Sequence, residues 1–129
     1  MKKLFFLSLI LILCVACQES LEDRCTRECK EYTTKKCPAP IDEFTTLDSL
    51  TFEPSTHTLC YFYTMKGAAD NAANINATTA REALVEQVKN ATSLKAYKDE
   101  GYNFRYAYHS QSDPSLLLFS TLITEKDYR

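Results

Sequence analysis

We expect four stretches of the chain to be β-strands. Three of them alternate with the period of two that is typical of strands, and the fourth, 116–124, is expected as the strand that returns after a turn. The stretches are 47–53, 58–65, 102–109 and 116–124. Glu53-Pro54-Ser55-Thr56-His57 separates the first two, and Asp113-Pro114 lies between the last two, so each pair has the composition of a hairpin. Both faces of 58–65 are apolar, which predicts a central strand.

Helical patterns fill the space between these hairpins. Thr79 and Glu82 have the spacing of a capping box, and an apolar stripe with the period of a helix follows as far as Ala91. A second short helix is expected over 93–100, closed by Gly101. Near the N-terminus, 21–32 also favours helix, before two prolines at 38 and 40 end it.

This order of elements predicts an α+β fold. We expect a four-stranded antiparallel sheet in ββααββ order, with helices on one face. The N-terminal helical segment has few apolar residues, so we expect disulfides to fasten it to the domain. The length remaining after residue 24 suits one domain, 25–129.

The first sixteen residues have the layout of a secretory signal. Lys2 and Lys3 precede an apolar run that is too short to span a bilayer stably, and the small residue Ala16 closes it. The three residues Val15-Ala16-Cys17 resemble the lipobox of bacterial lipoproteins, although Cys14 stands where a leucine is usual. An ordinary signal peptide or a short buried helix is the alternative interpretation.

The lipobox resemblance implies cleavage before Cys17, a diacylglycerol on its thiol and a further acyl chain, such as palmitate, on its amine. Residues 1–16 are then the signal peptide and 17–24 a lipidated tether. The acidic sequence Gln18 to Asp23 is similar to the tract that follows the lipid cysteine in surface lipoproteins of Bacteroidota. The chain as a whole resembles small lipoproteins of that group, which implies an outer-membrane location on the periplasmic or the exposed side.

The balance of charge disfavours nucleic acid as a partner. The chain has 15 basic and 17 acidic residues, and loss of Lys2 and Lys3 with the signal leaves a net charge of −4. Basic residues are interspersed with acidic ones, whereas phosphate binding needs clustered Lys and Arg.

Four cysteines remain once Cys14 and Cys17 are set aside: Cys25, Cys29, Cys37 and Cys60. In an exported chain this even number predicts two disulfides with three possible connectivities. A zinc site is a weaker alternative because the spacing lacks two close CxxC pairs. A thioredoxin-like redox pair is weaker still, since three residues separate Cys25 from Cys29.

The sequence gives little support for catalysis or for a cofactor. His57 falls in a predicted turn and His109 at a strand end, and a site would need both to converge with a carboxylate. No hydrolase, zinc-protease, P-loop or dinucleotide motif is present. We therefore expect a non-enzymatic protein without a cofactor or metal.

Aromatic residues on two strands are the best candidates for binding. Rings on an exposed sheet face stack on sugars or dock a peptide, but the same rings covered by helices would form the core. In that case the platform would be the opposite face, which includes Arg105 and His109. The candidate binding face comprises Tyr61, Tyr63, Tyr102, Tyr106, Tyr108, Arg105 and His109.

The sequence thus favours a membrane-anchored module that binds a protein, peptide or glycan. An inhibitor or immunity-type protein is an alternative, and a small thiol-redox or hydrolytic enzyme is a weaker one. Asp48-Ser49-Leu50 also resembles the tripeptide that Bacteroidota use for O-glycosylation, which marks Ser49 as a possible modified residue.

Overall fold

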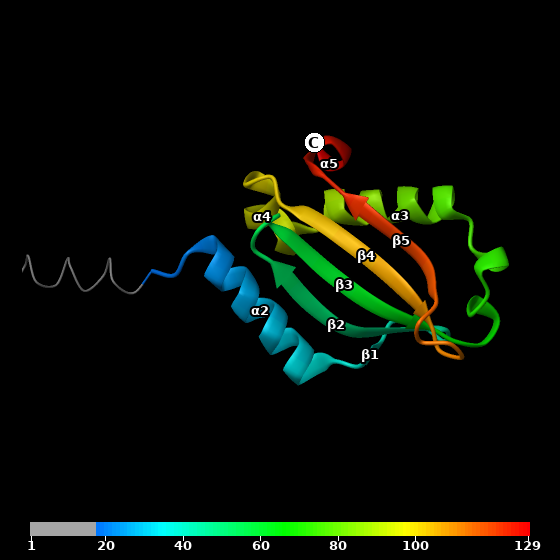
Figure 1. The fold of residues 1–129 in the computed structure, drawn as a ribbon. Coiled ribbons are helices and arrows are strands. Elements are labelled where there is room, and N and C mark those ends of the chain that lie inside the picture. The colour runs from blue at the N-terminus through cyan, green and yellow to red at the C-terminus, as the bar shows by residue number, and fades with distance from the viewer. Residues whose placement is uncertain (1–17) are drawn as a thin grey trace, which may run out of the picture.

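A five-stranded β-sheet is the central element of the computed structural model, which describes residues 18–129 (Figure 1). The predicted signal segment and Cys17 lie outside the described residues. The strands are β1 (Ala39–Pro40), β2 (Thr45–Glu53), β3 (Thr58–Met65), β4 (Asn103–Ser110) and β5 (Leu117–Ile123). The helices are α2 (Leu21–Lys36), α3 (Ala77–Asn90), α4 (Lys95–Asp99) and α5 (Glu125–Tyr128), with short 3-10 turns at η1 (Gly67–Ala69), η2 (Ala72–Asn74) and η3 (Thr92–Leu94).

The sheet is mixed, so the predicted four-stranded antiparallel sheet is wrong. The strand order is β1-β2-β3-β4-β5, and the central pair β3–β4 is parallel, with Thr58 opposite Asn103 and Met65 opposite Ser110. The helices between β3 and β4 carry the chain back along the sheet, so β4 starts at the same end as β3. The sequence did not predict the fifth strand, β1, because prolines at 38 and 40 are unfavourable in a strand interior. The strand is only two residues long, and Pro40 lies at the edge of the sheet.

Local capping explains where the two long helices begin. The Asn76 side chain accepts a hydrogen bond from the Thr79 amide at 3.1 Å and caps α3, so the predicted Thr79–Glu82 capping box is wrong. Ser20 caps α2 in the same way through the Asp23 amide. Beyond α4, Gly101 has φ of 72°, a left-handed conformation that glycine adopts at low cost and that turns the chain into β4.

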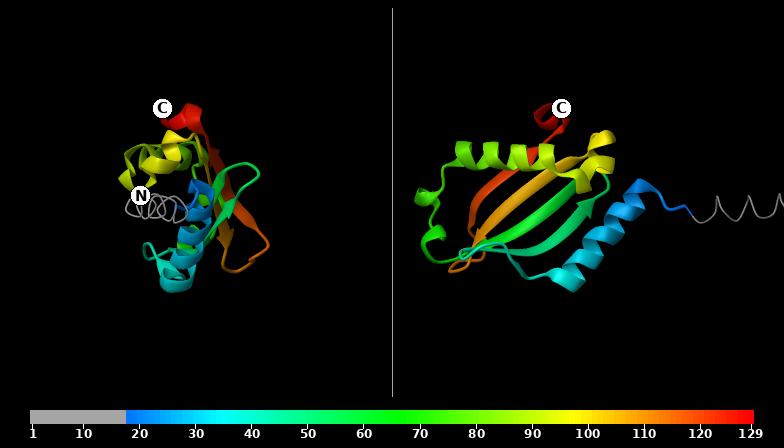
Figure 2. Two further views of the ribbon diagram at one scale, coloured as in Figure 1. Left: turned by 90° about the vertical axis from the view of Figure 1, so that its left-hand side faces the viewer. Right: turned by 180° about the vertical axis from the view of Figure 1, so that it is seen from behind.

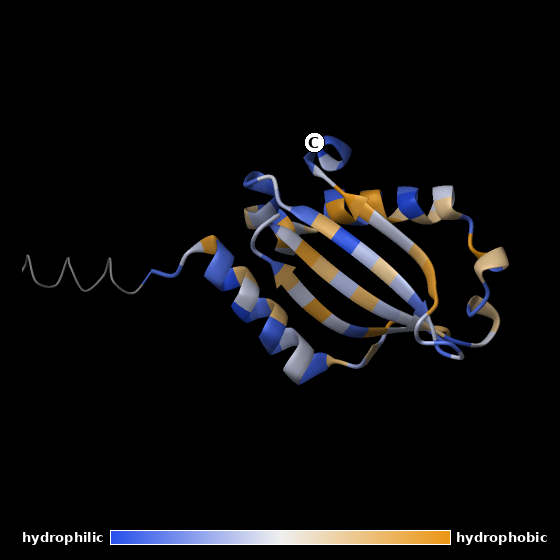
Figure 3. Cartoon of the chain, in the orientation of Figure 1, coloured by the Kyte–Doolittle hydropathy of each residue, from blue (hydrophilic) through white to orange (hydrophobic). Residues whose placement is uncertain are grey.

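The helices α2, α3 and α4 pack against the same face of the sheet, and the other face is open (Figure 2). Alternation along each strand places every second side chain under the helices, as the banding of apolar residues in Figure 3 shows. Phe104 and Ile123 are fully buried there, together with Val88 of α3. The centre of the core comprises Leu59, Tyr63, Leu84, Val88, Tyr97, Tyr102, Phe104, Tyr106 and Ile123.

The predicted disulfides are absent, and Cys25, Cys29, Cys37 and Cys60 are free thiols. Cys25 and Cys29 lie on the inner side of α2, within the core. Cys60 occupies an even-numbered position of β3, whereas Leu59 and Tyr61 face the helices, so its side chain points to the open face. The sheet therefore separates Cys60 from the α2 thiols, and the disulfides expected to fasten the N-terminal segment to the domain do not form.

Packing and hydrogen bonds hold α2 in place of disulfides. The Thr33 hydroxyl donates to the Leu50 carbonyl at 3.1 Å and accepts from the Leu50 amide at 2.9 Å. Leu50 lies beyond the short stretch of β2 that pairs with β1. The Thr33 side chain therefore satisfies the main-chain hydrogen-bonding groups that β2 would otherwise leave free at this edge. At the other end of α2, Glu22 contacts His57 Nε2 at 2.6 Å.

None of the helices between residues 18 and 129 is both long and apolar enough to cross a bilayer.

We expect the chain to keep its thiols reduced at the four described positions. Alkylation of the denatured 18–129 fragment without reductant should add one label to each of Cys25, Cys29, Cys37 and Cys60, as measured by intact mass. A fragment that gains labels only after reduction would contradict the packing described here. Because no bridge constrains the unfolded chain, reductant should also leave the thermal midpoint unchanged.

Candidate binding groove

A groove runs over the sheet between α2 on one side and the α3–α4 region on the other. It encloses a cavity of about 430 Å³ and is lined by side chains from α2, β2, β3 and the segment 87–97. Its floor includes Leu50 and Tyr61, and its walls include Tyr32, Leu94 and Tyr97. We call this feature the α2–α4 groove. Its lining is mainly apolar and aromatic, with a few polar groups, as is typical of sites that hold a ligand or a peptide segment.

Exposed apolar side chains mark one end of the groove. Tyr32 is 40% exposed and Ile41 is 55% exposed, and both line the cavity. Large apolar side chains with this exposure beside a cavity indicate an interaction surface rather than a core. The sequence singled out neither residue, because Tyr32 ends a polar helix and Ile41 lies in a proline-rich connection. Only their meeting in space reveals the groove.

The tyrosines of β3 and β4 form a stack beneath the helices. The parallel register puts Tyr61 beside Tyr106, with ring centroids 4.6 Å apart, and Tyr63 beside Tyr108 at 4.5 Å. Burial raises the pKa of all four phenols, that of Tyr108 to about 12 with a further contribution from Asp42. These phenols therefore stay neutral, and Tyr61 and Tyr63 form part of the groove floor.

The candidate residues from the sequence do not form a single surface. Tyr63, Tyr102 and Tyr106 are buried, and Tyr61 and Tyr108 are half-buried, all on the helix-covered side. Arg105 and His109 lie on the opposite face, where Arg105 is exposed and His109 is half-buried. Of the seven, only Tyr61 and Tyr63 line the α2–α4 groove. Ser49 is half-buried in β2, opposite Phe62 of β3.

A charged network spans the groove at Tyr97. The Tyr97 hydroxyl donates to Glu28 Oε2 at 2.7 Å, Arg24 Nε lies 2.8 Å from Glu28 Oε1, and the Arg24 guanidinium covers the Tyr97 ring. Burial alone would raise the pKa of Glu28, but the hydrogen bonds from Arg24 and Tyr97 outweigh it and lower that pKa. Glu28 is therefore a carboxylate at neutral pH, and its charge is paired with that of Arg24.

Two thiols lie deep in the same groove. A hydrogen bond between Cys25 and Cys29 raises the pKa of Cys25 and lowers that of Cys29, while burial raises both. Both residues are at least 96% buried, which shields the sulfur atoms from an attacking disulfide. The pair is therefore better placed for packing than for thiol exchange.

The geometry does not assemble a catalytic group from the histidines. His57 precedes β3 at one end of the sheet, where its carbonyl accepts from the Asn103 amide, and His109 lies at the far end of the parallel neighbour β4. Six residues of extended strand separate those ends by roughly 20 Å. Between residues 18 and 129, no three His, Cys, Asp or Glu side chains gather in a way that could hold a metal ion.

A family model described as a domain of unknown function, DUF8479, matches residues 20–119. The chain belongs to this family. The DUF8479 match covers α2, all five strands up to the middle of β5, and the whole α2–α4 groove. No curated protein matches the sequence.

Solved structures of three bacterial proteins share the fold. A protein of Pseudomonas aeruginosa described as secreted is similar over 87% of this chain and 100% of its own, with a TM-score of 0.68 and 14% identity. The type II secretion system pilotin AspS of Vibrio cholerae aligns over 83% of this chain and 91% of its own (TM-score 0.61, 14% identity). The Vibrio vulnificus pilotin EpsS aligns over 84% and 92% (TM-score 0.66, 9% identity). Because the identities are this low, the likeness shows that the DUF8479 chain has the same fold as these proteins and shows nothing about its function.

We expect Glu28→Gln to destabilise the 18–129 fragment by about 1 kcal/mol at pH 7, because a partly exposed charged hydrogen-bond acceptor is lost. The lowered pKa means that Glu28 stabilises the fold above the unfolded value of 4.5, and that this contribution is lost as the pH falls through the folded value. The difference between wild type and variant in urea denaturation should therefore shrink below about pH 4.5.

Glu31→Gln is the matched control, since Glu31 lies on the same helix but is exposed and pairs only with Arg27 at 3.4 Å. An equal loss in the two variants, or a difference that grows with acid, would rule out the Tyr97–Glu28–Arg24 network as the cause.

Proposed function

We propose that this protein is a non-enzymatic lipoprotein of the bacterial cell envelope that holds an apolar segment of a partner protein in the α2–α4 groove. The observation that carries the proposal is the groove itself, a cavity of about 430 Å³ with a rigid tyrosine floor and exposed apolar side chains at one end. The fold likeness to two type II secretion pilotins and a secreted protein supports a role in the envelope.

The groove favours an amphipathic helical or extended segment as its occupant. Leu50, Tyr61 and Leu94 offer apolar contacts over the sheet. A partner segment with an apolar face would complement these contacts. The groove has few polar side chains in its lining. A glycan, which needs many hydrogen-bonding groups, therefore fits it less well.

The predicted anchor places the groove close to the membrane. Cys17 is only four residues from the start of α2, a span of at most about 14 Å for an extended chain. Because α2 forms one wall of the groove, a bound partner would be held near the lipid surface. We place the protein at the outer membrane, on the basis of the lipobox and of Gln18 after the lipidated cysteine.

Replacement of the anchor residue tests the localisation. Cys17→Ser in the full chain should move the protein from the membrane pellet to the soluble fraction, because two or more acyl chains are lost. Mass spectrometry of the wild-type N-terminal peptide should find Cys17 acylated, and the peptide that contains Ser49 should carry a glycan if that serine is modified. A wild-type Cys17 that carries no lipid would contradict the anchor but leave the groove untested by this experiment.

The groove is tested by photo-crosslinking in cells that make the full anchored chain. A photoreactive side chain at Ile41 should form an adduct with one envelope protein, and the same group at Thr51, which is exposed on β2 and does not line the groove, should not. Leu94→Arg, which places a charge on the groove wall, should reduce the Ile41 adduct at least tenfold without loss of folding. Adducts of equal yield at Thr51, or at Ile41 despite Leu94→Arg, would refute the proposal.

A further inference from the structure

The two edges of the sheet differ in how well they are protected. On one side the two-residue strand β1, with Pro40, and the Thr33 hydroxyl cover β2. On the other side β5 is a seven-residue edge strand, and the stretch from Leu116 to Thr124 contains no charged residue and no proline. Leu116 and Leu117 are each 48% exposed. Natural sheets rarely leave such an edge uncovered, since it is ready to pair with another strand.

Hydrogen bonding identifies which backbone groups of β5 point outward. Arg81 Nη2 of α3 donates to the Leu122 carbonyl at 3.4 Å, so Leu122 presents its main-chain groups away from β4. Groups alternate along a strand, and Ser120 therefore presents its amide and carbonyl in the same direction. Ser120 is exposed. A β-bulge opposite Tyr108 and His109 ends the regular pairing at the start of β5, which leaves Ser120 near the middle of the free edge.

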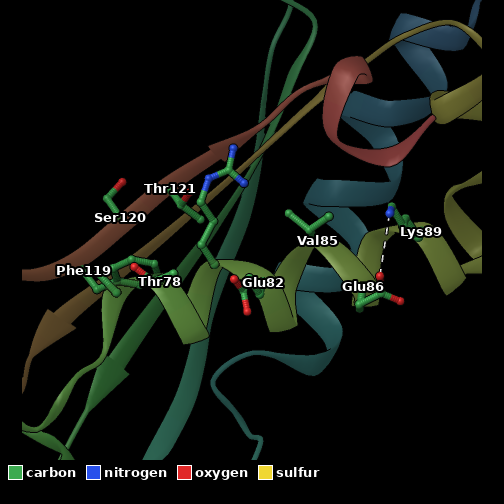
Figure 4. Close-up of a pocket in the computed structure, with 10 residues that line it drawn as sticks. Thr78, Glu82, Val85, Glu86, Lys89, Phe119, Ser120 and Thr121 are labelled. Carbon is green, nitrogen blue, oxygen red and sulfur yellow. Dashed lines mark ion pairs between the residues drawn. The ribbon is translucent and has the colours of Figure 1, made fainter.

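A groove of about 780 Å³ lies beside this edge, between β5 and the outer side of α3 (Figure 4). Phe119, Ser120 and Thr121 line it from the strand, and Val85 lies at its centre on the helix. Two basic residues, Arg81 and Lys89, and two acidic residues, Glu82 and Glu86, line the helix side. The strip has no net charge, although the domain as a whole is acidic, so two copies of it would not repel each other.

We propose that β5 pairs with β5 of a second copy of this chain, antiparallel and centred on Ser120. An interface of two identical patches requires a self-complementary pattern about its two-fold axis. The edge meets this requirement, because Leu118 and Leu122 lie two positions on either side of Ser120. Ser120 then exchanges two main-chain hydrogen bonds with Ser120 of the partner copy, and apolar residues meet apolar residues on both sides.

The dimer would join two five-stranded sheets into one continuous sheet and cover the exposed leucines. Such a strand-to-strand contact is small, so we expect a weak dimer in solution, with a dissociation constant in the range of about 10–100 µM. Chains confined to a membrane by their N-terminal ends would meet at a much higher effective concentration. The pairing itself does not depend on the α2–α4 groove or on lipidation.

The test uses the 18–129 fragment, which contains the whole described core. Sedimentation velocity over about 5–500 µM should show the wild-type mass rising toward that of a dimer. Ser120→Lys, which sets two ammonium groups opposite each other at the two-fold axis, should raise the dissociation constant at least tenfold. Thr51→Lys adds the same charge at an exposed position of β2 and should leave the constant unchanged. Circular dichroism checks that both variants are folded.

Hydrogen exchange gives a second, residue-level readout. The Ser120 amide should exchange slowly at high protein concentration and quickly at low concentration, whereas the Thr51 amide should exchange independently of concentration. A wild-type fragment that stays monomeric, or a dimer that survives Ser120→Lys, would overturn the proposal. Protection of Ser120 only after addition of envelope extract would show that the edge takes a strand of another protein, and would also overturn it.

Discussion

The parallel pairing of β3 with β4 is the constraint on which the rest of the structure depends. It aligns eight residue pairs, and among them Tyr61 meets Tyr106 and Tyr63 meets Tyr108. The stacked rings then form one continuous aromatic layer that α2, α3 and α4 cover. A parallel pair requires a crossover connection, and the helices that make this connection are also the wall of the α2–α4 groove. Fold and candidate site thus have a common origin.

The alternation of side chains in these strands also decides the fate of the cysteines. Tyr61 faces the helices, so Cys60 must face the open side and cannot meet Cys25. The helix α2 is instead held by contacts that no sequence pattern predicts. Thr33 bonds to the edge of β2, Glu22 contacts His57, and the Tyr97 hydroxyl donates to Glu28. An even number of cysteines in an exported chain indicates an oxidising compartment. Whether disulfides form depends on the distances between the cysteines in the fold.

Local patterns predicted the elements well and their arrangement poorly. The stretch 58–65 is β3 as predicted, and the strand expected over 102–109 lies one residue later in the chain. The direction of β4 relative to β3 was wrong because period-two alternation carries no information on whether neighbours run parallel. The groove was missed because it needs Tyr32, Leu94 and Tyr97 to meet across the fold. Asn76 replaced Thr79 as the cap of α3, since both are good N-cap residues and the sequence does not choose between them.

One hydroxyl group determines how the α2–α4 groove can behave. Thr33 both donates to and accepts from the main chain of Leu50, so a movement of α2 away from the sheet would break two hydrogen bonds. The α2–α4 groove therefore has a preformed width, and a partner segment must fit that width because widening the groove would break these hydrogen bonds. Because the groove is preformed, this protein loses little conformational entropy when a partner segment binds. The entropy that the partner segment loses on becoming ordered is then the main entropic cost of binding.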